Sequence, residues 1–154
     1  MALTIGLVGE ADLGEFLGLM RAYCDFYEVS PSDCALLELS RALIADPERE
    51  GVQLMARDDS DPGRRAVGFA SVFWSWATTR GARLAVMNDL FVAPDARGSG
   101  VADALIAECL QRARAHGAAA LEWQTASDNL RAQAVYERMG GERSERWLDY
   151  SLPT

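Results

Sequence analysis

The chain has 154 residues, of which 49% are apolar and 25% charged, an ordinary balance for a globular protein. Its formal net charge of −8 disfavours nucleic-acid binding, which depends on neutralising phosphates, and favours cationic small-molecule partners. No apolar run approaches the roughly 18 residues of a membrane span, and the first residues do not resemble a signal peptide. We therefore expect one domain over residues 1–154, located in the cytoplasm.

The chain has three cysteines and one histidine, and these counts limit the disulfides, metal sites and catalytic histidines that it can contain. Cys24, Cys34 and Cys109 are scattered without a Cys-x-x-Cys spacing, so we expect neither a disulfide framework nor a zinc site. A metal centre built on several histidines is excluded by the count. The single histidine, His116, follows a basic stretch that is typical of a helix C-terminus, and we interpret it as a capping residue rather than a catalytic base.

The first half of the chain alternates strand and helix patterns. Strands are expected at 4–8, 52–56, 66–76 and 83–92, and an amphipathic helix at 12–27. Residues 30–33 form a break and a new cap that includes Ser32, and a second helical face over 36–44 ends near 46–47. Turn-forming residues at 58–63 and 78–81 join the last three of these strands. This arrangement predicts an antiparallel meander.

The pattern changes after Val92. A loop at 93–100 opens a helix that ends at Gly117, and a strand follows at 119–124. A strand, a helix and a strand of these lengths predict a parallel pair joined by a crossover. A further helix is expected at 129–139 and a last strand at 147–151. Together these elements predict an α/β fold on a mixed sheet.

The segment Arg97-Gly98-Ser99-Gly100-Val101-Ala102 lies between a strand and a helix N-terminus. The first turn of a helix carries unpaired N–H groups and a partial positive charge, and glycines allow a pyrophosphate to approach those groups. Arg97 adds a permanent charge with forked donors. We interpret the segment as an anion cradle. The alternative is that its glycines serve only a tight turn.

Two other phosphate-binding loops do not fit this segment. A Walker loop needs a Gly-Lys pair, and lysine is absent here. A dinucleotide-binding fingerprint needs a third glycine where Asp103 stands, in a unit that opens the chain, whereas about 95 residues precede this loop.

Two motifs carry a family resemblance. Val92, Pro94 and residues 97–102 form an apolar strand, a proline turn and Arg-x-x-Gly-x-Gly/Ala, and residues 129–140 match Asn-x-x-Ala-x-x-x-Tyr-Glu-x-x-Gly. At this spacing the motifs resemble those of the GNAT superfamily of N-acetyltransferases, over the last 70 residues above all. The resemblance implies a mixed, mostly antiparallel sheet flanked by helices, with a splayed parallel strand pair at the cofactor site.

The same resemblance implies acetyl-coenzyme A as co-substrate, direct transfer to an amine, and no metal. The pantetheine arm would pair with strand 87–92, and a backbone N–H, that of Leu90 in our interpretation, would polarise the thioester carbonyl. The implied cofactor-binding residues are Leu90, Phe91, Val92, Arg97, Gly98, Ser99, Gly100, Val101, Ala102, Asn129 and Tyr136.

Tyr136 is our candidate for the catalytic acid. It lies seven residues after Asn129, close to two helical turns, so both side chains share a face. A phenol pKa near 10 is close to that of a thiol, which suits protonation of a departing thiolate. Without the family pattern, Tyr136 would be interpreted as an ordinary aromatic packed on the core.

The general base has two candidates, Glu122 and Asp89, acting directly or through a water. Both lie on predicted strands, where a solvated face is the common explanation for an acidic residue. Strand alternation places Asp89 on the face opposite Asn88 and Leu90, unless a bulge re-aims it.

Residues 67–70 and 88–92 resemble the diamine and polyamine acetyltransferase branch, although Asn88 stands where that branch often has a carboxylate. The resemblance implies a small, cationic amine acceptor and a homodimer. Its implied acceptor-binding residues are Asp25, Glu28, Asn88 and Glu145. Two alternatives stay open: a non-catalytic sensor that binds acyl-coenzyme A, and an acetyltransferase for protein or peptide amines.

Overall fold

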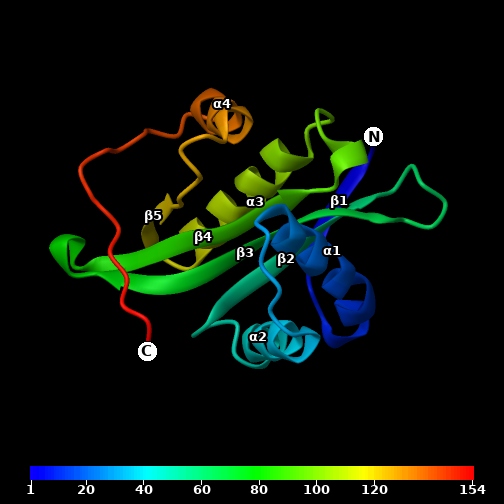
Figure 1. Cartoon of the computed structure of the whole chain (residues 1–154), viewed down its shortest axis with the longest axis horizontal. Helices are drawn as coiled ribbons and strands as arrows, with labels where there is room; N and C mark the ends of the chain where they lie inside the picture. Colours follow the sequence, from blue (N-terminus) through cyan, green and yellow to red (C-terminus); the bar gives the residue numbers. More distant parts are fainter. The chain divides into compact units, whose positions relative to one another are not determined.

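Five strands form one mixed sheet in the computed structural model, which describes residues 1–154 (Figure 1). The strands follow one another across the sheet in chain order, namely β1 (Leu3–Leu7), β2 (Gly51–Asp58), β3 (Ala66–Ala77), β4 (Ala82–Val92) and β5 (Ala118–Glu122). The helices are α1 (Leu13–Phe26), α2 (Asp33–Ala45), α3 (Val101–Ala115) and α4 (Leu130–Arg138). The chain divides into two compact units, Met1–Gln124 and Thr125–Thr154, and the sheet belongs to the first.

Strand directions in the first unit agree with the prediction of a mixed sheet. Neighbouring strands from β1 to β4 are antiparallel, and tight connections between β2, β3 and β4 form the predicted meander. Only β4 and β5 are parallel. Their connection contains α3, as a parallel pair requires a crossover.

The helices of the first unit cover both faces of its sheet. In Figure 1, α1 and α2 lie on the near face and α3 lies behind the strands. On the near face, the fully buried Phe16 of α1 packs edge-on against Phe69 of β3, with ring centroids 5.2 Å apart. On the other face, Gly68 of β3 lies beneath Val101 and Leu105 of α3. The sheet is therefore buried on both sides, which fixes the position of α3 relative to β4.

Local chemistry sets the helix ends. Ser32 precedes α2, and its hydroxyl accepts a hydrogen bond from the N–H of Ala35 at 3.1 Å, the expected N-cap. At the end of α3, the N–H of His116 donates to the carbonyl of Arg112, and Gly117 follows with a φ of 79°. The structure confirms His116 as a capping residue. Its ring stacks on Trp74 with a centroid separation of 4.0 Å.

The second unit contains α4 and an irregular C-terminal segment. The side chain of Asn129 caps α4 by accepting a hydrogen bond from the N–H of Ala132 at 3.2 Å, and Gly140 ends the helix with a φ of 87°. The strand predicted at 147–151 is wrong, because residues 141–154 form neither helix nor strand. An alternating apolar pattern becomes a strand only when another strand supplies hydrogen bonds, and all five strands of the sheet come from residues 3–122.

None of the helices is both long enough and apolar enough to cross a membrane.

Gly68 provides a test of the packing between β3, β4 and α3. A Cβ atom at this position would lie 2.7 Å from the carbonyl oxygen of Phe91 and 3.1 Å from a methyl carbon of Val101. We expect Gly68→Ala to lower the free energy of unfolding by about 1–3 kcal/mol through overpacking, measured by urea denaturation. The matched control is Gly18→Ala in α1, where a Cβ meets no atom within 4 Å, and where alanine should stabilise the helix by up to about 1 kcal/mol. An unchanged midpoint for Gly68→Ala would contradict the packing described here.

Candidate active site

The site begins where β4 and β5 part. Their pairing runs from Arg83 opposite Ala118 to Val86 opposite Glu122, where β5 ends. β4 continues to Val92 and stays paired with β3 on its other edge. The segment 87–92 therefore has one edge without a neighbouring strand in the sheet, and the predicted splayed pair is confirmed. Unpaired backbone groups along such an edge can bind an extended ligand as an added strand would.

A bulge in β4 re-aims the side chains at this edge. Asp89 lies opposite Ser71 of β3, but Met87 lies opposite Val72, so Asn88 is an extra residue without a partner. Met87 is consequently buried, Asn88 is exposed, and the amide of Asn88 donates to the Asp89 carboxylate at 3.1 Å. Asp89 faces α1, as does Phe91 two residues later, since alternate strand residues share a face.

The glycine-containing loop follows β4 directly. Gly98 and Gly100 have φ values of 78° and 87°, in the left-handed region that favours glycine. An added Cβ at either position would meet no atom within 4 Å, so the space beside this backbone is open. The N–H groups of residues 98–102 donate to no acceptor in the chain, and the helical pattern begins only when Ala104 donates to the carbonyl of Gly100 at 3.0 Å. These are the features of an anion-binding helix N-terminus.

Arg97 links the loop to the end of β4. Its Nε donates to the carbonyl of Val92 at 3.1 Å. Its guanidinium carbon lies 5.8 Å from the ring centre of Phe26 and 6.0 Å from that of Phe91, within the range of a cation–π contact. The guanidinium is therefore held at the C-terminal end of β4, next in sequence to the glycine loop.

The C-terminal end of α1 covers the bulge. The ring of Tyr23 packs edge-on against Phe91, with centroids 6.1 Å apart, and its hydroxyl hydrogen-bonds with Asp89. Burial, and then the charge of Asp89, raise the pKa of Tyr23 above its ordinary value. Two predicted acceptor-binding residues, Asp25 and Glu28, lie on the exposed side of this same helix end. Of the predicted residues, the structure places Asp25 and Asp89 around Cys24, and Asn88 beside Asp89.

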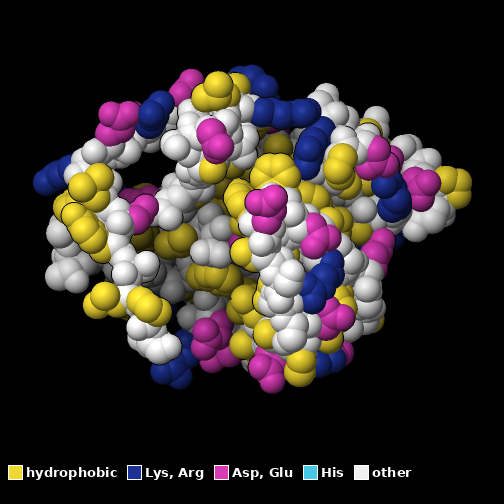
Figure 2. Space-filling model, in the orientation of Figure 1, with side chains coloured by type: hydrophobic (Ala, Val, Ile, Leu, Met, Phe, Trp, Pro, Cys, Tyr) yellow, Lys and Arg dark blue, Asp and Glu magenta, His cyan; other side chains and the backbone are white.

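Acidic side chains are spread over this face of the first unit. Figure 2 shows them, in magenta, among apolar atoms over α1 and α2. Burial raises the pKa of the Cys24 thiol, the charge of Arg21 lowers it, and the charges of Asp89 and Asp25 raise it. Two carboxylates therefore lie close to the end of α1, whereas the 98–102 loop presents N–H donors.

Glu122, the second candidate base, has a different environment. It is the last residue of β5, is exposed, and forms an ion pair with Arg80 at 3.0 Å. Arg80 comes from the turn η2 (Thr78–Arg80) between β3 and β4. Glu122 therefore lies at the last position where β4 and β5 are paired, and its negative charge is balanced by that of Arg80.

The remaining predicted residues belong to the second unit. Asn129 uses its Oδ1 to cap α4, which leaves its two Nδ2 donors for other partners. Tyr136 lies on α4, and its carbonyl accepts a hydrogen bond from the N–H of Gly141 at 2.9 Å. Glu145 follows the helix and pairs with Arg143 at 2.8 Å.

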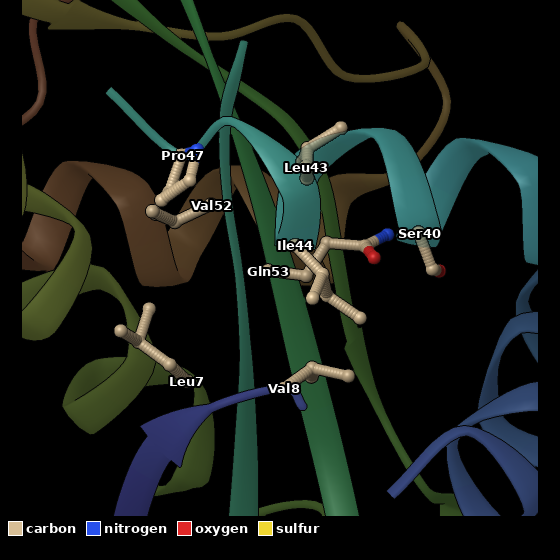
Figure 3. A pocket seen from close by; sticks show the side chains of 8 residues that line it. All are labelled: Leu7, Val8, Ser40, Leu43, Ile44, Pro47, Val52 and Gln53. Atoms are coloured by element: carbon tan, nitrogen blue, oxygen red, sulfur yellow. The ribbon is translucent and has the colours of Figure 1, made fainter. Parts of the chain in front are cut away.

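A separate cavity of about 100 Å³ lies between α2 and the sheet. Figure 3 shows the side chains that line it, namely Leu7, Val8, Ser40, Leu43, Ile44, Pro47, Val52 and Gln53. The amide of Gln53 points into it, and its Nε2 donates to the buried hydroxyl of Ser71 at 3.1 Å. None of the site residues predicted from the sequence lines this cavity.

Sequence reasoning missed two features of the site. Tyr23 occupies a regular apolar position of α1, 66 positions before Asp89, so nothing in the pattern marks it as a polar partner of that residue. Arg80 was predicted only as part of a turn. Both roles depend on which strands become neighbours.

A splayed strand pair followed by an amide-rich glycine loop at a helix N-terminus defines an acyltransferase site that can hold a phosphorylated carrier. The sequence pattern of the acetyltransferase (GNAT) family matches residues 16–141. The chain belongs to that family, and it is an acetyltransferase.

Individual relatives agree with this assignment. The chain is 26% identical to the uncharacterized N-acetyltransferase YhfO of Bacillus subtilis over 142 residues, which are 92% of this chain and 91% of the relative. It is 28% identical to the L-methionine sulfoximine/L-methionine sulfone acetyltransferase of Pseudomonas aeruginosa, over 68% of this chain and 64% of the relative. The structure of AAC(6')-Iy with the bisubstrate analogue CoA-S-monomethyl-acetylneamine is similar in fold, with a TM-score of 0.83, 21% identity and complete coverage of both chains.

Proposed function

We propose that this acetyltransferase transfers the acetyl group of acetyl-coenzyme A to the amine of a small, cationic acceptor by direct attack. One observation carries the proposal: the free edge of β4 is followed, after a short turn at Pro94–Ala96, by the open loop at 97–102. A carrier with an extended arm and a pyrophosphate needs these two features in this order.

The loop fits the pyrophosphate of coenzyme A. The N–H groups of residues 98–102 provide several donors without competing acceptors in the chain, and the open space beside Gly98 and Gly100 admits phosphate oxygens. Arg97 adds a positive charge held at the Val92 carbonyl. In this proposal the backbone of residues 90–92 pairs with the pantetheine arm, and the Leu90 N–H polarises the carbonyl.

Charge at the end of α1 supports a cationic acceptor. Asp25 and Glu28 are exposed there, and Asp89 faces the same helix end. An alkylammonium group is attracted to such carboxylates before it loses its proton. Asn88, exposed at the bulge, can donate to or accept from the acceptor, and Glu145 of the second unit is a further candidate contact.

The names of similar proteins suggest which acceptors to examine first. One relative acts on L-methionine sulfoximine and L-methionine sulfone, and one structural neighbour is an aminoglycoside N-acetyltransferase. The resemblance to the diamine and polyamine branch adds a third class of small amine. Protein and peptide amines are the competing class of acceptor.

The proposed reaction forms a C–N bond between the acceptor amine and the acetyl carbon, and breaks the C–S bond of the thioester. The amine gives up one proton to Asp89 or Glu122, directly or through a water. Tyr136 donates a proton to the departing sulfur, and Asn129 uses its Nδ2 donors to hold the pantetheine arm. The products are an N-acetylated amine and free coenzyme A. We also propose that residues 1–154 act as one domain.

A homodimer is the assembly that we propose. The C-terminal segment exposes large apolar side chains, which soluble proteins tend to cover. They are Trp147, Leu148, Tyr150 and Leu152, with exposed fractions of 75–90%.

The cofactor loop is tested by Gly100→Val. A branched side chain is strained at a φ of 87° and fills the space that the phosphates would occupy, so we expect the affinity for coenzyme A to fall by about tenfold or more. Arg97→Ala should also weaken binding. Isothermal titration calorimetry with coenzyme A measures both. The matched control is Gly81→Val, with a φ of 57° in the turn at the opposite end of β4, which should leave the affinity unchanged. Unaltered binding by Gly100→Val would exclude the loop as the pyrophosphate site.

The acid is tested by Tyr136→Phe. Loss of the hydroxyl should reduce turnover by roughly a hundredfold while affinity for coenzyme A stays near that of the natural chain, because the ring is kept. Thiol release from acetyl-coenzyme A is measured with diamines, amino acids, aminoglycosides and a histone-like peptide as acceptors. Turnover of Tyr136→Phe at the natural rate would remove Tyr136 from the mechanism. Binding of the cofactor without turnover of any acceptor would favour a sensor.

A further inference from the structure

We propose that Tyr23 is a positioning residue that holds the Asp89 carboxylate toward the acceptor amine, and that Asp89, rather than Glu122, accepts the proton of that amine. This inference rests on the proposed function and names the base that it leaves open. It depends on three observations: the bulge in β4, the packing of Tyr23, and the pairing of Glu122 with Arg80.

The bulge at Asn88 decides which way Asp89 points. In the pairing of β3 with β4, Phe69 lies opposite Phe91, and Ser71 lies opposite Asp89. Tyr23 of α1 packs on both Phe69 and Phe91, so the face that carries these residues is the one beneath α1. Asp89 shares that face and lies on the segment of β4 that has left β5. A carboxylate here faces the helix end that carries Asp25 and Glu28, at the free edge of the sheet.

The ring of Tyr23 is fixed by its neighbours. It makes edge-on contacts with Phe69 at 5.6 Å, Phe91 at 6.1 Å and Tyr27 at 5.1 Å between centroids. Three such contacts leave the ring little freedom, so the hydroxyl has a defined position. The hydroxyl donates to the carboxylate of Asp89, which in turn accepts from the amide of Asn88. Two donors from different elements thus hold one carboxylate.

Tyr23 is suited to hold a proton rather than transfer it. Burial is the main cause that raises its pKa, and the charge of Asp89 and the hydrogen bond raise it further. The phenol therefore stays protonated at neutral pH and remains a hydrogen-bond donor. Its role is to orient Asp89, while Asp89 receives the proton.

Buried polar groups continue behind Asp89 across the sheet. Ser71 is fully buried at the position opposite Asp89, and Gln53 of β2 lies opposite Ser71 and donates to its hydroxyl. The remainder of this face is packed with aromatic and aliphatic side chains. Gln53, Ser71 and Asp89 thus form a row of polar side chains within an apolar layer. Because an unpaired polar group in the interior costs free energy, this row restricts the positions that the Asp89 carboxylate can adopt.

Glu122 lacks these features. It stands at the last paired position of β5, is exposed to solvent, and has its charge balanced by Arg80 at 3.0 Å. To serve as base it would have to leave this ion pair. Asp89 instead interacts with the phenol of Tyr23 and the amide of Asn88, neither of which is a cation.

The experiment compares Tyr23→Phe with Tyr27→Phe, the adjacent exposed tyrosine of the same helix end. Both changes remove one hydroxyl and keep the ring. We expect Tyr23→Phe to lower kcat by about tenfold while KM for acetyl-coenzyme A is unchanged, and Tyr27→Phe to keep the natural rate. Asp89→Asn should lower kcat by roughly a hundredfold, and by much more than Glu122→Gln does. The double variant Tyr23→Phe/Asp89→Asn should be no slower than Asp89→Asn, because Tyr23 acts through Asp89.

An alkaline titration of tyrosine absorbance reports on the pair without any acceptor. In the natural chain Tyr23 should ionise at higher pH than a free tyrosine. In Asp89→Asn a negative charge beside Tyr23 is removed, which favours the tyrosinate, so the Tyr23 transition should move to lower pH. Burial remains, and the shift should therefore be partial.

These readouts separate the inference from the proposed function. An enzyme that turns over while Tyr23→Phe keeps the natural kcat would overturn the inference alone, as would a titration that Asp89→Asn leaves unchanged. Loss of turnover in Glu122→Gln together with an active Asp89→Asn would assign the base to Glu122. If the natural chain releases no thiol with any acceptor, the proposed function itself is wrong.

Discussion

The hydrogen-bonded pairing of β4 with β5 stops after Val86 and Glu122, and the site depends on this interruption. Up to that point β4 has a partner on both edges; beyond it, residues 87–92 have β3 alone. A parallel strand pair is normally buried and continuous, so an edge opened in the interior of a sheet leaves backbone donors and acceptors that need a partner. The packing of Gly68 beneath α3 and of Phe91 beneath α1 keeps this part of β4 in place on both faces.

The bulge at Asn88 places Met87 and Asp89 of the same strand on opposite faces of the sheet. Before the bulge, Met87 is buried opposite Val72, and after it Asp89 faces the helix α1. Without the extra residue, Met87 and Asp89 would share a face, and one of them would have an unsuitable environment. The same strand then ends at Val92, whose carbonyl accepts from Arg97. A short stretch of backbone thus connects the proposed acceptor end with the loop that begins the helix α3.

Local signals predicted much of the fold, whereas contacts between distant segments were not accessible from the sequence. The cap at Ser32, the helix end at Gly117 and the turns of the meander follow from residues within a few positions of one another, and the structure confirms them. The bulge at Asn88 depends on the register with β3, which no residue near Asn88 specifies. Tyr23 was indistinguishable from its apolar neighbours in α1. The strand predicted at 147–151 was wrong because an alternating pattern forms a strand only where a neighbouring strand accepts and donates its backbone hydrogen bonds.

The charge distribution suits the two proposed substrates, which are of opposite sign. The net charge of −8, from 15 basic and 23 acidic residues, repels a polyanion at long range. Backbone N–H groups at residues 98–102 and the guanidinium of Arg97 act only over short distances, where water is displaced and the interaction is strong. Asp89 lies three residues before Val92, or about 10 Å along a strand. In the proposed function an anionic carrier and a cationic amine are therefore each bound by their own groups, while their reacting atoms meet on the free edge of β4.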